Sequence, residues 1–418
     1  MTVLIRQASI IHPSSPFHGT KKDILIIDGI ISAINDQIEK DEAFLIEAPG
    51  LCISTGWMDI FADFADPGYE HRESISTGSA ASAAGGFTDV ILVPNTKPAI
   101  DNKSQVEYIR QHSGKYGVSL YPIGAVTRNA EGKELAEMYD MQQSGAIAFG
   151  DGIHCIQNPD ILLKALLYVK SFDGTIIQLP EDKQISHHGL MNEGITSTQL
   201  GLPGIPAIAE ELMIARDIDL LKYTGSRLHI TGVSTRKSLE MIELARTAGL
   251  NITCSVTPYH LYFCDEDLAD YDTNLKVNPP LRTKEDMMAL RESVKNGRID
   301  CIASHHSPQH KDHKLCEFEY AGNGMIGLES VFAMVTAVGL PVEDFVNMQT
   351  VRSRNIFGIP VPEIKEGLPA CLTLFTKNTE YTFSASQVFS KSRNLSIIGN
   401  KFPNKVIGII NGPKTLIH

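Results

Sequence analysis

Eight short apolar runs, rich in β-branched residues, follow one another along the middle of the chain and are separated by polar, glycine or proline residues. Runs of this length and composition are typical of buried β-strands. Longer stretches with helical patterning lie between them, and Asn158-Pro159 and Thr283 stand where two of these helices are expected to begin. The expected strands are residues 57–64, 88–94, 118–124, 146–150, 175–180, 227–233, 251–258 and 299–306.

Eight strand–helix units in succession predict an α/β fold, a closed parallel (β/α)8 barrel of the TIM type. An open, doubly wound sheet is the alternative. The count of eight disfavours it, and no GxGxxG motif follows the first strand. In such barrels the chemistry takes place where the strands end, at the C-terminal face, so the residues at those ends are the candidates for function.

The two ends of the chain have a different pattern from the middle. Residues 1–52 and 362–418 consist of short apolar or alternating runs separated by Gly, Pro and Ser, as strands and turns require. We therefore predict a small composite β-sandwich domain built from both ends, with the barrel in residues 53–361. A chain of 418 residues is long enough for a barrel with such an accessory domain.

Composition narrows the possible partners and the compartment. The chain has 37 basic and 49 acidic residues, a net charge of −12, which argues against nucleic acid and anionic membranes as partners. No apolar run is long enough for a transmembrane helix, and the first residues read as a strand rather than a signal peptide. Seven cysteines without a CxxC pair predict a reduced, cytoplasmic protein.

Several long segments together resemble the bacterial type I dihydroorotases of the amidohydrolase superfamily. The first runs from Met58-Asp59 to VPNTKP and includes the stretch EHRESISTGSAASAAGGFTDV. The resemblance covers almost the whole chain, because it continues to the C-terminal β-rich part. The other segments are 187–217, 227–235 (RLHITGVST), 256–261 (VTPYHL), 275–282 (LKVNPPLR), 321–330 (AGNGMIGLES) and 363–375.

The resemblance implies an activity and a metal centre. Enzymes of this family interconvert N-carbamoyl-aspartate and dihydroorotate in de novo pyrimidine biosynthesis by closing or opening a cyclic amide. Two zinc ions at the barrel mouth share a hydroxide and polarise the scissile carbonyl, and an aspartate after strand eight moves the proton. The implied ligands are a His-x-His pair on strand one, an aspartate after strand four, histidines ending strands five and six, and the strand-eight aspartate.

Only one of the six implied ligand positions keeps its residue, and that residue is Asp151 in AFGDG. Zinc needs three or four oxygen, nitrogen or sulfur donors, and phenylalanine and glycine side chains supply none. We therefore predict that the two-zinc centre and catalysis are lost and that no cofactor is bound. One zinc ion held by Asp63, Asp151 and His305 is the alternative. The five altered positions, in chain order, are Phe61, Asp63, Gln178, Gly232 and His305, the last at the place of the family's base.

The implied substrate contacts are altered as well. The arginine that grips the substrate carboxylate is Ala65 here, and alanine cannot provide a bidentate fork. A second histidine of the strand-eight motif is Gln309. Asn95 and Asn278 match substrate-contacting asparagines, although either could equally cap a barrel loop. The histidine-rich run 304–313 could be a new metal cluster, but a solvated loop is the favoured interpretation.

Three functions remain open at this point. The first is a non-catalytic dihydroorotase-like protein that acts by binding, with aspartate carbamoyltransferase or an active dihydroorotase as the partner that the resemblance implies, and with a homodimer as the expected assembly. The second is an active dihydroorotase or another cyclic amidohydrolase with a rebuilt mononuclear metal site. The third is a small-molecule sensor with a remnant pocket around Asn95 and Asn278.

Overall fold

The barrel is closed by contacts between its first and its eighth strand. The structure is a computed structural model that describes residues 1–13 and 15–418. In this part of the chain, eight strands form one parallel sheet in the order β6-β7-β8-β9-β10-β13-β14-β15. Ala62 forms a parallel bridge with His306, and Asp63 N donates to His306 O at 2.8 Å. The prediction of a (β/α)8 barrel is therefore confirmed.

All eight expected strands coincide with observed strands of this sheet. The strands are mostly apolar along their length because helices cover the outer surface of the sheet and leave the strands buried on both faces. The strands are β6 (Trp57–Ala62), β7 (Phe87–Leu92), β8 (Ser119–Gly124), β9 (Ala148–Phe149), β10 (Ile176–Gln178), β13 (Leu228–Ile230), β14 (Ile252–Val256) and β15 (Cys301–Ile302).

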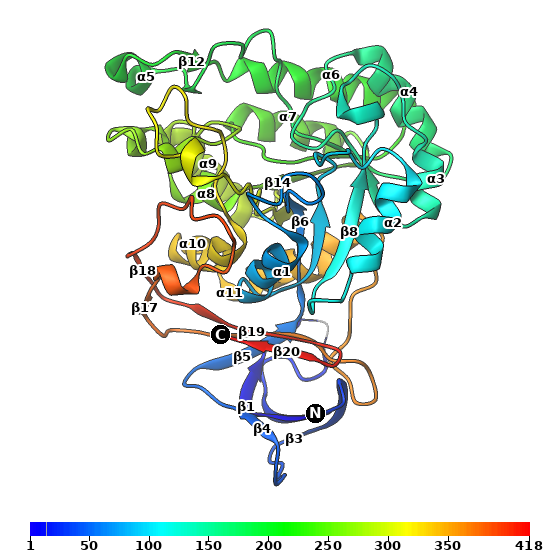
Figure 1. Ribbon diagram of the computed structural model, residues 1–418, viewed down its shortest axis with the longest axis vertical. Helices are drawn as coiled ribbons and strands as arrows, with labels where there is room; N and C mark the ends of the chain where they lie inside the picture. The colour runs from blue at the N-terminus through cyan, green and yellow to red at the C-terminus, as the bar shows by residue number, and fades with distance from the viewer. Residues whose placement is uncertain (14) are drawn as a thin grey trace.

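The two helix starts expected from the sequence, at Asn158 and Thr283, are side-chain caps in the structure. The Asn158 side chain accepts from Asp160 N, and Thr283 accepts from Asp286 N, so each satisfies a free amide of the first turn. Figure 1 shows the helices arranged around the strands. They are α1 (Ile75–Ala84), α2 (Lys103–His112), α3 (Met138–Gln143), α4 (Pro159–Lys170), α5 (Ile195–Leu200), α6 (Ile208–Thr224), α7 (Arg236–Thr247), α8 (Pro258–Tyr262), α9 (Lys284–Lys295), α10 (Val331–Ala337), α11 (Val342–Asn347) and α12 (Ser353–Ile356).

Strands from both ends of the chain share a second sheet, called here the terminal sheet. Its order is β20-β19-β16-β5-β1-β2-β3, with β4 paired to β1. Figure 1 places both termini on it, below the barrel. The domain limits 1–52 with 362–418, and 53–361, stay a prediction. The strands are β1 (Thr2–Ile10), β2 (Lys21–Ile27), β3 (Ile30–Asn35), β4 (Phe44–Ile46), β5 (Leu51–Thr55), β16 (Cys371–Thr376), β19 (Lys405–Asn411) and β20 (Lys414–Ile417).

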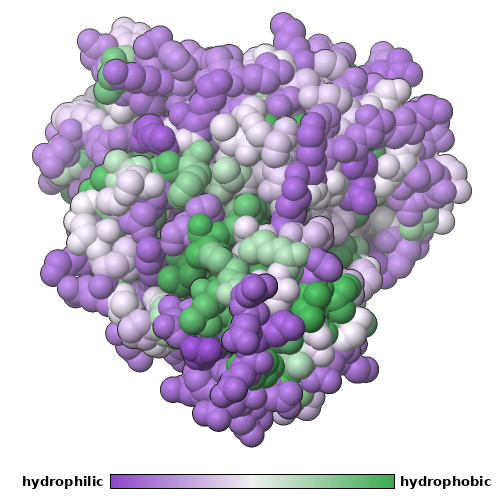
Figure 2. All heavy atoms as spheres, turned by 60° about the horizontal axis from the view of Figure 1, so that its bottom comes forward, coloured by the Kyte–Doolittle hydropathy of each residue, from purple (hydrophilic) through white to green (hydrophobic). Residues whose placement is uncertain are grey.

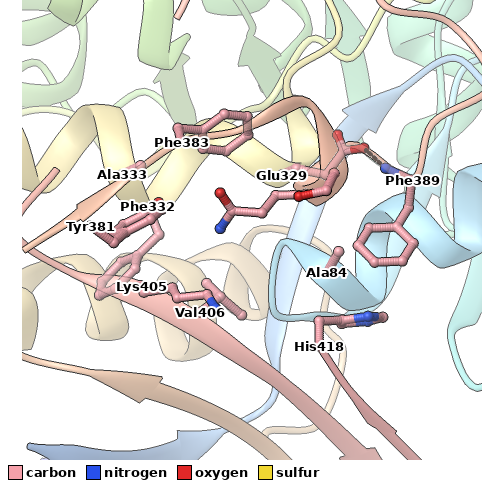
Figure 3. Close-up of a pocket in the computed structure, with 12 residues that line it drawn as sticks. Ala84, Glu329, Phe332, Ala333, Tyr381, Phe383, Phe389, Lys405, Val406 and His418 are labelled. Atoms are coloured by element: carbon pink, nitrogen blue, oxygen red, sulfur yellow. Dashed lines mark hydrogen bonds between the residues drawn. The ribbon is translucent and has the colours of Figure 1, made fainter. Parts of the chain in front are cut away.

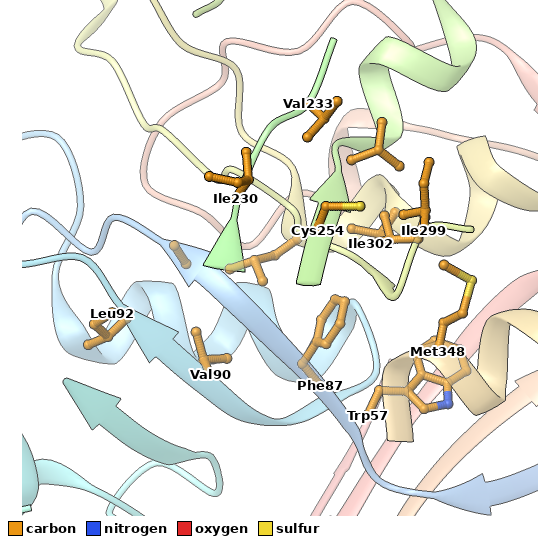
Figure 4. Packing of buried hydrophobic residues seen from close by; sticks show 14 of the residues in the cluster. Trp57, Phe87, Val90, Leu92, Ile230, Val233, Cys254, Ile299, Ile302 and Met348 are labelled. Carbon is orange, nitrogen blue, oxygen red and sulfur yellow. The ribbon is translucent and has the colours of Figure 1, made fainter. Parts of the chain in front are cut away.

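An aromatic cluster joins the terminal sheet to the barrel. Trp57 starts β6, and its ring centroid lies 5.0 Å from that of Phe332, 4.9 Å from Phe345 and 5.4 Å from Phe375 on β16. All four rings are buried. Figure 4 shows Trp57 beside Met348, with aliphatic side chains of the barrel strands nearby. This packing fixes the barrel on the sheet and leaves the opposite, C-terminal ends of the strands free for a site.

The terminal sheet also presents apolar side chains to solvent. Met1, Ile30, Phe44 and Leu45 are between 40% and 60% exposed. Figure 2, which turns this end of the molecule toward the viewer, shows apolar side chains gathered within a hydrophilic surround. Within the described residues, no helix is both long and apolar enough to cross a bilayer.

Candidate site at the barrel mouth

The candidate residues lie near the C-terminal ends of the strands, and all of them are buried except Asn95 and Asn278, which are half-buried. A cavity of about 180 Å³ opens there, and four of the residues singled out from the sequence line it. These are Phe61, Asp63, Asn278 and His305. Asp151, Gln178 and Gly232 also lie near the strand ends but are not part of the cavity wall. The fold therefore gathers most of the predicted positions, although only some of them face the same space.

Phe61 and His305 fill the centre of this mouth together. Their rings stack with centroids 4.5 Å apart and planes inclined by 30°. His305 Nε2 lies 2.7 Å from Thr231 Oγ1. Burial lowers the pKa of His305 to about 3, so the imidazole is neutral at physiological pH. The residue at the base position is therefore packed and hydrogen-bonded.

Asp63 is engaged in an ion pair that was not predicted from the sequence. Arg72 donates from its terminal nitrogen to Asp63 Oδ2 at 2.7 Å, and the amide of Ala65 donates to Oδ1 at 2.7 Å. Both carboxylate oxygens thus have partners. The signal available in the sequence was an arginine nine residues after a buried aspartate, but only the turn at Ala65 brings the two together.

Asp151 and Asn95 stabilise the loop that follows β9. Asp151 accepts from Thr127 N at 2.9 Å and from Thr127 Oγ1 at 2.5 Å, and burial raises the pKa of Asp151 to about 6. Asn95 donates to Asp151 O at 3.0 Å and accepts from Ile153 N at 2.9 Å. Both ends of the Asn95 amide are therefore used within the loop, which favours its loop-capping role.

Asn278 and Gln309 also have protein partners. Asn278 lines the cavity and donates to Glu181 Oε2 at 3.0 Å. The Gln309 side chain donates to Asn323 O at 2.8 Å and holds the loop after β15. Of the two asparagines in the remnant pocket expected from the sequence, only Asn278 borders the cavity.

The position of the His305 imidazole requires that residue 232 has no side chain. Gly232 has φ of +69°, and a Cβ built there would lie 2.7 Å from His305 Cε1 and 2.9 Å from Leu179 Cδ1. Any side chain would therefore be strained by both the backbone and the packing. Glycine at this position makes room for the imidazole. The side chain of Gln178 has only long hydrogen bonds among the described residues, 3.4 Å from Ile156 N and 3.4 Å from Asp217 Oδ2.

Replacing Gly232→His alone is expected to lower the free energy of unfolding by about 1–3 kcal/mol, because the new side chain meets His305. The double variant Gly232→His/His305→Asp is expected to regain only the part of this loss that comes from His305, since the shorter aspartate leaves that space while the positive φ and the contact with Leu179 remain. Urea unfolding of the two single variants and the double variant gives the coupling energy. Additive effects would contradict this dependence.

The side chains present do not fit a two-zinc centre. Phe61 and Gly232 offer no donor atom, Asp63 is paired with Arg72, and Nε2 of His305 is bonded to Thr231. Within residues 1–13 and 15–418, no three His, Cys, Asp or Glu side chains are grouped so that they could hold a metal ion. That statement includes the histidines of the run 304–313.

A second cavity, of about 240 Å³, lies between α10 and the C-terminal segment, away from the mouth. Figure 3 shows Phe332, Phe383, Lys405 and His418 around it, with Glu329 bonded to the backbone of Phe389. Its wall contains none of the residues singled out from the sequence. The barrel mouth therefore remains the candidate site.

Buried histidine also makes this end of the barrel sensitive to acid. His260 on α8 donates from Nε2 to Pro280 O at 3.1 Å, and burial lowers its pKa from 6.5 to about 4. The unfolded chain takes up this proton near pH 6.5 and the native state only near pH 4, so stability falls as the pH drops through that window.

We expect wild type to lose about 2 kcal/mol more than His260→Gln between pH 7 and pH 5. Denaturant unfolding at both pH values measures this difference. His188→Gln, which changes an exposed histidine, is the matched control and is expected to follow the wild type. If the free energy of unfolding changed with pH in the same way for wild type and His260→Gln, the native state would accept a protonated His260 without penalty.

Comparison with known proteins agrees with this fold. A family model described as dihydro-orotase-like matches residues 50–238. A protein named dihydroorotase from Caldicellulosiruptor saccharolyticus is 38% identical, and the match covers 99% of this chain and 98% of that protein. Another, from Caldanaerobacter subterraneus subsp. tengcongensis, is 39% identical over 97% and 95% of the two chains.

Solved structures with the same fold are more distant in sequence. An L-hydantoinase (dihydropyrimidinase) from Arthrobacter aurescens has a TM-score of 0.83 at 22% identity and covers 100% of this chain and 97% of its own. A dihydropyrimidinase from Brevibacillus agri NCHU1002 has a TM-score of 0.81 at 19% identity, with coverage of 100% and 95%. At these identities the likeness concerns the fold alone.

Proposed function

Because the chain belongs to the dihydroorotase family, we propose that it is a dihydroorotase-like protein of pyrimidine biosynthesis that has lost the two-zinc centre and acts by binding. One observation carries this proposal: the stacked rings of Phe61 and His305 occupy the place where ligands and base would be needed. The stack has no free donor toward a metal on the Phe61 side, and His305 Nε2 is already bonded to Thr231.

The neighbouring positions support the same conclusion. Asp63 has both oxygens engaged, by Arg72 and by the amide of Ala65. Gly232 brings no donor and cannot take a side chain without displacing His305. The substrate clamp is also missing, because Ala65 is buried and apolar where a carboxylate substrate would need a guanidinium. Metal binding and carboxylate binding are therefore weakened by separate changes.

The test is metal analysis of protein purified without added zinc, together with assays of dihydroorotate hydrolysis and of the reverse ring closure. We expect much less than one zinc ion per chain and no turnover above background. The dihydroorotase of Caldicellulosiruptor saccharolyticus, prepared in parallel, is the positive control. One zinc ion per chain with measurable hydrolysis that Asp151→Ala abolishes would instead establish the mononuclear enzyme.

The binding role that we propose is support of aspartate carbamoyltransferase or of an active dihydroorotase, by a homodimer of this chain. The exposed apolar side chains of the terminal sheet, among them Phe44 and Leu45, are the kind of surface that protein partners cover. Co-expression with the host carbamoyltransferase and size-exclusion chromatography test this role. A chain that elutes as a monomer and leaves the carbamoyltransferase unchanged in size and activity would contradict it.

A further inference from the structure

The second cavity, between α10 and the C-terminal segment, is large enough for a small ligand. Its volume is about 240 Å³, and an engineered protein cavity of roughly 150 Å³ already holds benzene. It therefore has space for an aromatic ring with a short polar substituent. Figure 3 shows side chains of the barrel helices and of the C-terminal segment around it. Its aromatic wall consists of Phe332, Tyr381, Phe383 and Phe389.

The carboxylate of Glu329, in the wall of this cavity, has one oxygen without a protein partner. Glu329 is only 6% exposed. Its Oε1 accepts from Phe389 N at 3.1 Å and from Ser390 N at 2.9 Å, whereas the buried Oε2 has no hydrogen bond to any residue that the structure describes. A buried acceptor without a donor is costly, so a donor group inside the cavity would stabilise Glu329.

Two donor groups in the same wall are also unused. Within residues 1–13 and 15–418, the Lys405 ammonium has neither an ion pair nor a hydrogen bond. Gln387 Oε1 accepts from Ser384 N at 2.8 Å. Because a backbone amide only donates, this bond identifies the other end of the Gln387 side chain as the NH₂ group, and among the described residues that group has no partner. Both groups are suited to an anionic group of a ligand.

These groups match the charges of an amino acid zwitterion. Glu329 and Lys405 do not pair with each other, so each remains available to a different group of one ligand. An ammonium would supply the donor that Glu329 lacks, and a carboxylate would supply the counter-ion of Lys405. A ligand with only one of these charges would satisfy only one of the two side chains. The aromatic wall favours a ring as the rest of the ligand, because aromatic rings pack well against one another.

We propose that this cavity binds a free aromatic amino acid. The ligand's ammonium donates to Glu329 Oε2, its carboxylate accepts from Lys405 Nζ and Gln387 Nε2, and its ring packs against Phe332 and Phe383. The site is separate from the barrel mouth and does not depend on whether the mouth holds zinc. The inference therefore goes beyond the proposed function, and either can fail without the other.

Four probes separate the contributions of the two charges and the ring. L-phenylalanine has all three groups, whereas phenethylamine lacks the carboxylate, 3-phenylpropionate lacks the ammonium and L-alanine lacks the ring. Each is titrated into the full-length protein, with binding followed by calorimetry. We expect L-phenylalanine to bind at least about tenfold more tightly than each of the others, since hydrogen bonds between charged groups are strong. Equal or tighter binding of any other probe overturns the proposal, and so does the absence of saturable L-phenylalanine binding.

Variants of the two charged side chains test the recognition. Glu329→Gln retains an acceptor for the two backbone amides but replaces the unpartnered oxygen by an NH₂ group, and we expect at least about tenfold weaker binding of L-phenylalanine. Lys405→Met retains the apolar stem and is expected to weaken binding by a similar factor. Glu380→Gln and Lys401→Met, which break an exposed ion pair, are the matched controls and are expected to leave affinity unchanged. Unchanged affinity in both Glu329→Gln and Lys405→Met overturns the proposal.

NMR of the wild-type protein locates the ligand without relying on variants that fold. With labelled methyl groups, the L-phenylalanine ring is expected to show intermolecular NOEs to Ala84 and Ala333, which line this cavity. Val93 and Leu179 line the cavity at the barrel mouth. NOEs to these two methyl-bearing side chains alone would place the ligand at the mouth and overturn the proposal.

Discussion

Zinc binding is expected to return when the five altered positions carry the family's ligands in one chain. We expect about two zinc ions per chain after dialysis, against far less than one in the parent, measured by elemental analysis. The reason is that Asp151 is still present and that the exchange also removes the stacked rings that fill the mouth. The substitutions are Phe61→His, Asp63→His, Gln178→His, Gly232→His and His305→Asp.

The substitutions have to be made together because of the packing. Gly232→His alone meets the imidazole of His305, and Phe61→His alone leaves that imidazole in place. Adding Asp151→Ala to the fivefold variant is the control, and it is expected to lower the zinc content again. A fivefold variant that folds but retains less than one zinc ion would show that the barrel mouth has changed beyond its ligands.

Catalysis is expected to remain poor in the fivefold variant. Ala65 and Gln309 still fail to hold the substrate carboxylate in place. Adding Ala65→Arg and Gln309→His is expected to raise the turnover of dihydroorotate by about a hundredfold, the order of effect that substrate positioning has. Equal turnover with and without this pair would mean that other residues position the substrate.

The second large effect is expected for Arg354→Met, which should lower the free energy of unfolding by about 3–5 kcal/mol. Arg354 and Asp89 are buried, with the guanidinium 2.6 Å from Asp89 Oδ2. Arg354 also donates to Thr350 O at 3.1 Å. Methionine preserves the apolar stem but leaves the Asp89 carboxylate buried without its counter-ion.

Denaturant unfolding measures this loss. Arg227→Met breaks an exposed pair with Asp173 and is expected to cost less than about 1 kcal/mol. Because the penalty comes from the uncompensated charge, Arg354→Met/Asp89→Asn is expected to recover part of it. A loss below about 1 kcal/mol for Arg354→Met would indicate that water or another group reaches Asp89.

Hydrophobic patterning alone was sufficient to predict the barrel. Each strand lies in a local apolar run, and each capping residue, such as Asn158 or Thr283, acts on the next few amides. The lack of metal-donor atoms at two of the implied ligand positions was also evident from the sequence, since the side chains of Phe61 and Gly232 offer none in any conformation. These features depend on residue type and on the order of neighbouring residues, and the sequence gives both directly.

Tertiary structure decided how the remaining polar groups are used. Phe61 and His305 are 244 residues apart, and only closure of the barrel stacks their rings. The turn at Ala65 pairs Asp63 with Arg72, and Thr231, directly after β13, supplies the hydroxyl that contacts His305. Contacts of this kind depend on distances between remote segments, so residue type could not reveal whether Asp63 and His305 were free ligands or already engaged.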